Sequence, residues 1–116
     1  MKSNGFVMLP HEFEDDMIHR TPSEIRVYIY LLRYKNGNKD GWVSASFSFI
    51  MGHTGLSRHS VSDSILGLVK AGWIQDIQHF DKDNNKYLLA ENKTSANIEL
   101  LKVEQNRRKK RREMRV

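Results

Sequence analysis

The stretch around Gly55 places a glycine between two helical patterns, and it is the strongest constraint on the fold. Glycine supplies the positive φ that a tight turn between two helices needs. Ser57 is a typical N-cap for the second helix, and Gly72 follows its expected end. The second helix repeats apolar residues at positions i, i+4 and i+7, namely Val61, Ile65 and Leu68. The pattern predicts a helix–turn–helix unit whose first helix covers about residues 46–53.

Two helices are expected before this unit. A short one begins at Pro10 and runs to about residue 19, because the fixed φ of proline suits the first helical position. The next begins with Pro22, and a capping box is expected between Thr21 and Glu24. Its apolar residues recur at helical spacing; they are Ile25, Tyr28, Ile29 and Leu32. We expect this to be the central core helix, ended by a loop at residues 36–41.

Short extended segments flank the helix–turn–helix unit. Trp42-Val43 is read as a very short strand, and residues 73–80 and 86–90 as two strands joined by a turn at residues 81–85. A two-stranded hairpin is barely stable alone, so it must pack on the helices. A polar helix is expected from about Ser95. The order of elements predicts an α+β fold, with a domain at residues 1–92 and a C-terminal basic helix at residues 93–116.

Positive charge is concentrated at one end of the chain. The net charge is +5, but residues 105–116 hold seven basic residues and one acidic residue, a net charge of +6. Residues 1–104 hold 12 basic and 13 acidic residues, a net charge of −1. The body is therefore close to neutral, and the net positive charge of the chain comes from residues 105–116.

Several classes of protein are excluded by composition. The chain has no cysteine, which rules out disulfides and thiolate zinc sites. The longest apolar run, at residues 27–32, is far too short to span a membrane, and no apolar signal segment follows the first residues. We therefore expect a protein of the cytoplasm.

Two stretches carry a resemblance to a known family. Thr54-Gly55-Leu56-Ser57-Arg58, together with the apolar repeat and Gly72-Trp73-Ile74, resembles bacterial winged helix–turn–helix DNA-binding domains. Residues 5–10 and 23–34 resemble more narrowly the N-terminal domains of phage and plasmid replisome organisers and DnaD-type replication initiators. The resemblance covers roughly residues 5–90 and implies a three-helix core with a β-hairpin wing. Such domains usually have Ala where the first motif helix crosses the second, whereas this chain has Met51.

By this resemblance the second motif helix is the recognition helix, which enters the major groove. The expected DNA contacts of this helix and the wing are Ser57, Arg58, His59, Ser60, Ser62, Lys82, Asn84 and Lys86. The planar fork of Arg58 suits a guanine edge or a phosphate, and wing cations suit an adjacent backbone or minor groove. Asp63 would repel phosphate, so we expect it to face solvent or pair locally. The alternative for each residue is a solvated side chain on an exposed face.

The basic run near the C-terminus is expected to act as an electrostatic arm for nucleic acid. Its residues are Arg107, Arg108, Lys109, Lys110, Arg111 and Arg112. The alternatives are a solvated, fraying helix end and a linker to another domain. Little apolar surface accompanies the run, so membrane binding is not expected.

Other chemistry is not indicated. The five histidines lack metal-ligand spacing, and Lys86 takes the position where a calcium loop at residues 81–92 would need Gly. No phosphate loop, nucleophile elbow or pair of catalytic acids is present, so we expect no enzyme and no cofactor. The large aromatic residues are expected to pack in the core or hairpin; they are Trp42, Trp73, Tyr28, Tyr30 and Tyr34.

These features together predict a sequence-specific double-stranded DNA-binding protein that serves replication initiation in a phage or plasmid, at the nucleoid. A transcriptional regulator of the same fold is the first alternative. A protein-interaction module is the second, because the body is nearly neutral. Expected partners are double-stranded DNA, replication proteins and a second copy of the chain, which would meet the first through Ile98 and Leu101.

Overall fold

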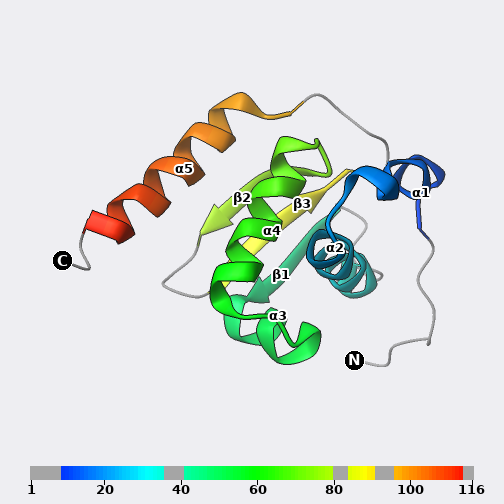
Figure 1. Cartoon of the computed structure of the whole chain (residues 1–116), viewed down its shortest axis with the longest axis horizontal. Helices are drawn as coiled ribbons and strands as arrows, with labels where there is room; N and C mark the ends of the chain where they lie inside the picture. Colours follow the sequence, from blue (N-terminus) through cyan, green and yellow to red (C-terminus); the bar gives the residue numbers. More distant parts are fainter. Residues whose placement is uncertain (1–8, 36–40, 80–83, 91–95, 114–116) are drawn as a thin grey trace.

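The helices and strands follow one another in the order that the sequence predicts. The computed structural model describes residues 9–35, 41–79, 84–90 and 96–113. Its elements are α1 (His11–Asp16), a short 3-10 helix (Met17–His19), α2 (Pro22–Lys35), β1 (Trp42–Ser46), α3 (Phe47–Thr54), α4 (Arg58–Lys70), β2 (Ile74–His79), β3 (Asn84–Leu89) and α5 (Ile98–Glu113). Helices α2 and α4 lie over the sheet and contact each other, and α5 runs beside α4 and β2 (Figure 1). The fold is α+β, as expected, and its arrangement is that of a winged helix–turn–helix with an added C-terminal helix.

The sheet has three strands rather than an isolated hairpin. Their order is β1-β3-β2, and both pairings are antiparallel, with Tyr87 of β3 opposite Val43 on one side and Ile77 on the other. The expected two-residue strand at Trp42-Val43 was therefore too short. Burial alternates along β1, so that Val43 and Ala45 face the core, but serines at the positions between them hid this pattern. The third strand stabilises a hairpin that would be marginal by itself.

The predicted turn at residues 81–85 extends too far toward the C-terminus. Asn84 and Asn85 belong to β3. The Asn85 side chain is buried and donates to the Tyr87 hydroxyl at 3.0 Å, so its polar groups are paired inside the sheet rather than exposed in a turn. Residues 80–83, including Lys82, lie outside the described residues.

Local capping decides where the first helices begin. The capping box is confirmed: the Thr21 amide donates to Glu24 Oε1 at 3.0 Å, and the Glu24 amide donates to Thr21 Oγ1 at 3.1 Å. Pro10 is the residue before α1, not its first residue, and the α-helix ends at Asp16 before the 3-10 turn continues to His19. Glu24 also lies directly against Gly67 of α4, where any Cβ would collide with its carboxylate. The glycine thus allows the start of α2 to approach α4 closely.

The core is built around three aromatic rings from distant parts of the chain. Phe13 stacks on Tyr28 with ring centroids 4.0 Å apart, and Trp73 meets both rings edge-on. The Trp73 indole N–H donates to Asp16 Oδ2 at 2.8 Å, and the Tyr28 hydroxyl donates to the Ala90 carbonyl at 3.0 Å. These contacts fasten α1 and α2 to the sheet, and they confirm the packing roles expected for Tyr28 and Trp73.

The remaining aromatic residues lie outside this centre. Tyr30 and Tyr34 stack on each other at the outer side of α2 and contact His53 of α3, while Phe49 meets Tyr34 and His53. Trp42 is half-buried at the start of β1. The outer rings thus pack α2 on α3 rather than standing free.

Helix α5 is docked on the body at successive turns. It begins at Ile98, later than the expected Ser95, because Asn97 caps it: Asn97 Oδ1 accepts from the Leu100 amide at 3.1 Å. The side-chain nitrogen of Asn97, Nδ2, donates to the Gln75 carbonyl of β2 at 2.8 Å. Leu100 is buried in the common hydrophobic core. The division at residues 92 and 93 remains a prediction, but α5 and the body share one core.

None of the helices that the structure describes is both long enough and apolar enough to cross a membrane.

Candidate nucleic-acid interface

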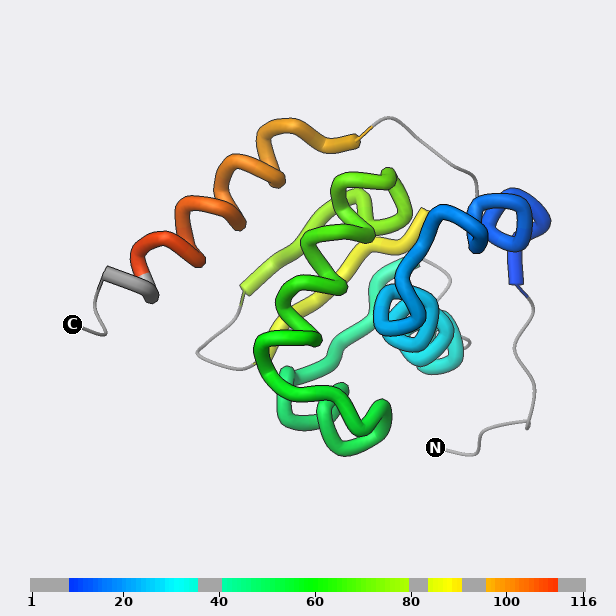
Figure 2. Tube along the Cα trace, in the orientation of Figure 1, coloured from blue at the N-terminus to red at the C-terminus, as the bar shows by residue number. Residues whose placement is uncertain are grey.

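The turn between α3 and α4 has the geometry that the sequence indicates. Gly55 has φ +75° and ends α3, with its amide bonded to the Met51 carbonyl at 2.9 Å. Thr54 braces the turn, because its hydroxyl donates to the Ile50 carbonyl at 2.6 Å and accepts from the Leu56 amide at 3.3 Å. Figure 2 shows this turn at the lower edge of the molecule, with α4 rising from it across the sheet. Met51, at the position where Ala is usual, is half-buried against the core.

The first turn of α4 is rigidly capped. Ser57 Oγ accepts from the Ser60 amide at 3.1 Å and donates to Ser60 Oγ at 3.0 Å. The hydroxyl of Ser64 bonds the Ser60 carbonyl one turn further on. Ser57 and Ser60 therefore bond each other in this structure, and the first turn of α4 presents the positive end of the helix dipole.

Arg58 is the first residue of α4. Its guanidinium carbon lies 5.3 Å from the centre of the Phe47 ring, a cation–π contact that crosses from α4 to α3. The Arg58 side chain is exposed. The planar guanidinium fork of Arg58 is the kind of group that bidentate recognition of a base edge or a phosphate requires.

Asp63 pairs in a way that sequence spacing only partly predicts. Its Oδ2 lies 3.1 Å from His59 Nε2, so it does pair locally, one of the two expected outcomes, and its Oδ1 bonds Arg108 Nη2 of α5. His59 is exposed, whereas the Arg108 side chain is 25% exposed. Helix α4 and the basic helix α5 are therefore joined by an ion pair.

Ser62 turns toward α5 rather than toward open solvent. It is half-buried and lines a small cavity, about 20 Å³, together with Glu104 and Arg108. A cavity of this size holds roughly one water molecule. A contact between Ser62 and DNA remains a prediction. Helix α5 lies beside the face of α4 that carries Ser62.

The wing supplies two of its expected contact residues within the described chain. Asn84 is exposed at the start of β3, and Lys86 is half-buried, opposite Ser44 of β1 and Gln78 of β2. Neither position is tested for DNA contact by the fold alone, so both remain predictions.

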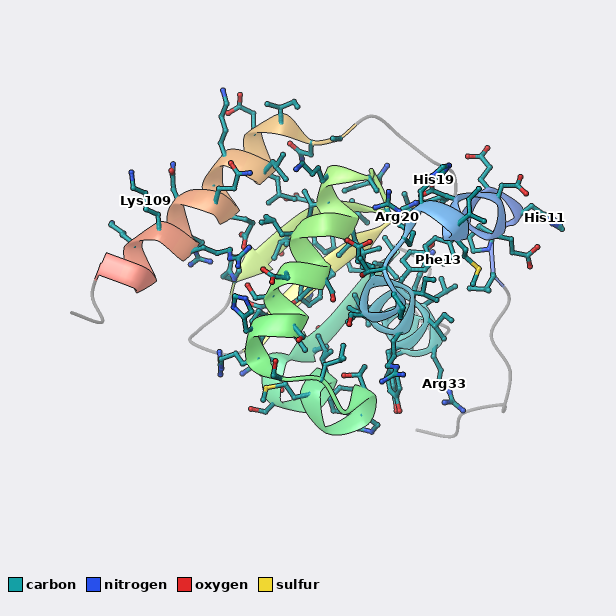
Figure 3. The ribbon with its side chains drawn as sticks, viewed as in Figure 1. His11, Phe13, His19, Arg20, Arg33 and Lys109 are labelled. Carbon is teal, nitrogen blue, oxygen red and sulfur yellow. The ribbon has the colours of Figure 1, made fainter. Side chains whose placement is uncertain are left out.

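Helix α5 divides its basic residues between two directions. Arg107, Lys109 and Lys110 are exposed, while Arg108 faces α4. Figure 3 shows Lys109 pointing away from the body. The backbone of Arg111 and Arg112 also lies within α5, so the basic run is helical to Arg112. Of the two expected dimer residues, Ile98 is 55% exposed, and Leu101 packs against the core of its own chain.

A polar network at the wing was missed by sequence reasoning. His79 joins three elements: its Nδ1 lies 2.6 Å from Asn85 Oδ1, and its Nε2 lies 2.9 Å from Glu104 Oε1 of α5. Burial raises the pKa of the neighbouring Tyr87 hydroxyl, so it stays neutral and accepts from Asn85. His79 and Glu104 are 25 residues apart, and no local pattern links residues at that separation. Within the described part of the chain, no group of three His, Asp or Glu side chains is placed to hold a metal ion.

Part of the chain matches a known family of domains. Residues 21–74 match the model of a helix-turn-helix domain family, and the matched range runs from the cap of α2 to the first residue of β2. No curated protein matches the chain, and no solved structure matches it. Residues 21–74 thus form a helix-turn-helix domain, and a domain of this kind implies DNA binding.

Proposed function

We propose that the chain binds double-stranded DNA sequence-specifically, with α4 in the major groove, the β2–β3 wing on the flank and the basic turns of α5 on the phosphate backbone. The observation that carries the proposal is the convergence of these three segments. The beginning of α4, the end of β2 and the last turns of α5 lie on the side of the molecule opposite α1 (Figure 1). Asp63, His79 and Glu104 fasten them together.

The charges of the two ends support this orientation. Exposed acidic residues gather on α1, among them Glu12, Glu14 and Asp15, whereas the exposed cations of α5 lie at the far end of the molecule. A protein with such a charge dipole is steered so that its basic end meets the phosphates first. An α4 of 13 residues is about 20 Å long, a length that fits in the major groove.

The proposed process is replication initiation in a phage or plasmid, and it rests on the resemblance to replication proteins. Selection of bound fragments from the source genome distinguishes the two roles that a sequence-specific protein of this fold can have. Recovery of fragments from an origin supports replication initiation, whereas recovery of promoter fragments supports transcriptional regulation. Failure to bind any duplex, with the protein folded, would contradict DNA binding and favour the protein-interaction alternative.

Arg58→Ala is expected to weaken binding to the selected site by about tenfold to a hundredfold, because loss of one bidentate base contact costs about 1–3 kcal/mol. Binding to a random-sequence duplex changes far less, so the specificity ratio falls. Both affinities are measured by fluorescence anisotropy at one salt concentration.

Arg33→Ala is the matched control for this prediction. It removes the same charge from the last turn of α2, and Figure 3 shows Arg33 pointing away from the molecule on the side away from α5. An equal loss of affinity in both variants would assign the effect of Arg58 to net charge rather than to recognition.

A further inference from the structure

An acidic residue lies in the middle of the proposed DNA-binding face. Asp63 is on the exposed side of α4, with its side chain 48% exposed, and both its carboxylate oxygens are engaged. One oxygen meets His59 of the same helix, and the other meets Arg108 of α5. Both partners are residues for which we expect contacts with DNA.

A carboxylate offers these two side chains the same kind of bond that a phosphate offers. Both groups are anionic, and both accept charge-assisted bonds from a guanidinium fork. In the free protein the Asp63 carboxylate therefore occupies two donors that would otherwise be available to the DNA backbone. A phosphate that approaches this part of α4 is repelled by Asp63 and must also compete for His59 and Arg108.

The docking of α5 holds Arg108 at this position. Leu100 anchors the helix in the core, and Glu104 bonds His79 one turn later. Arg108 follows Glu104 by four residues, so it lies on the same side of the helix and faces α4. The ion pair with Asp63 is thus placed by a docked helix rather than by a free tail.

We propose that Asp63 is a specificity-determining residue that lowers the affinity of the protein for DNA of arbitrary sequence. It does so as an internal competitor of phosphate for His59 and Arg108. In the major groove an aspartate accepts a hydrogen bond from the cytosine amino group, so a site that presents this group to Asp63 offsets part of the penalty. This inference rests on the proposed DNA binding of α4.

The test compares Asp63→Asn with the unaltered protein on a short random-sequence duplex, by fluorescence anisotropy across a salt series. The expected result is a Kd about threefold to tenfold tighter, with a slope of log K against log salt that is steeper by about 0.9, because the released Arg108 gains a phosphate contact. In an Arg108→Gln background, the same substitution is expected to give a smaller gain. On the selected genomic site the gain is also smaller, so the specificity ratio falls.

Glu14→Gln is the matched control. Glu14 is also an exposed carboxylate beside a histidine, 4.0 Å from His11 Nδ1, and its side chain is 54% exposed. Figure 3 shows His11 at the end of the molecule opposite Lys109. Removal of this charge is expected to leave the affinity and the salt slope unchanged.

The outcomes separate this inference from the function on which it rests. If the unaltered protein binds duplex and Asp63→Asn binds equally or more weakly, the inference is overturned and the DNA-binding proposal stands. If Glu14→Gln tightens binding as much as Asp63→Asn, the effect is one of net charge, and the inference is again overturned. Absence of duplex binding by every folded variant overturns both.

Discussion

A variant in which Arg107, Lys109, Lys110, Arg111 and Arg112 are all replaced by Gln binds random-sequence duplex at least about a hundredfold more weakly at moderate salt, and its salt slope is shallower by up to about 4.5. The physical reason is counterion release, since each lost phosphate contact removes about 0.9 from the slope. Arg108 is retained, so its pair with Asp63 continues to dock α5. Glutamine has nearly the helix propensity of lysine and arginine, and the helix is therefore preserved.

The control for this prediction keeps the charge and changes the side chains. In it the three arginines of the set become lysines, and the salt slope is expected to stay close to that of the unaltered protein. Circular dichroism checks that α5 remains helical in both variants. A slope unchanged by the five glutamines would show that the basic run makes no phosphate contacts and would make it a linker.

Trp73→Ala is expected to lower the free energy of unfolding by about 3–5 kcal/mol, the usual cost of truncating a large buried aromatic residue. The Trp73 side chain is fully buried and packs edge-on against both Phe13 and Tyr28. The substitution also takes the indole N–H away from the buried Asp16 carboxylate, whose desolvation is then less well compensated. Since small domains are stable by about 5–15 kcal/mol, the loss is a large share of the total. Urea unfolding followed by far-UV circular dichroism measures it.

Trp42→Ala provides the comparison at a half-buried tryptophan of β1. We expect it to cost clearly less than Trp73→Ala, because part of the Trp42 ring is already in contact with solvent. Equal losses for the two variants, or a loss below about 1 kcal/mol for Trp73→Ala, would contradict the central packing role assigned to Trp73.

Signals within a few residues of one another were predictable from the sequence. The capping box at Thr21 and Glu24, the left-handed Gly55 and the cap at Ser57 were all confirmed, because each depends on bonds within one turn of chain. The amphipathic repeat of α4 likewise placed its core face, with Val61 and Leu68 fully buried. Local bonds and helical periodicity decide these features, so a single sequence contains them.

Pairings between distant segments were not predictable in the same way. The pairing of β1 with β3 joins Trp42 to Leu88, and burial of Asp16 follows from its bond to Trp73. The docking of α5 likewise depends on partners in α4 and β2, which composition alone does not reveal. The basic run appeared to be an independent tail because its charge is visible in the sequence, whereas the carboxylate that receives Arg108 is known only from the fold.

Recognition of a guanine edge by Arg58 is measured by replacing, one at a time, each guanine of the selected site with 7-deazaguanine, which lacks the N7 acceptor. Binding of each modified site is compared between the unaltered protein and Arg58→Ala. We predict one position at which the replacement weakens the unaltered protein by about tenfold and leaves Arg58→Ala unaffected, because the two changes remove the same contact. Equal losses for both proteins at every position, or no loss at any of them, would contradict recognition of a guanine by Arg58.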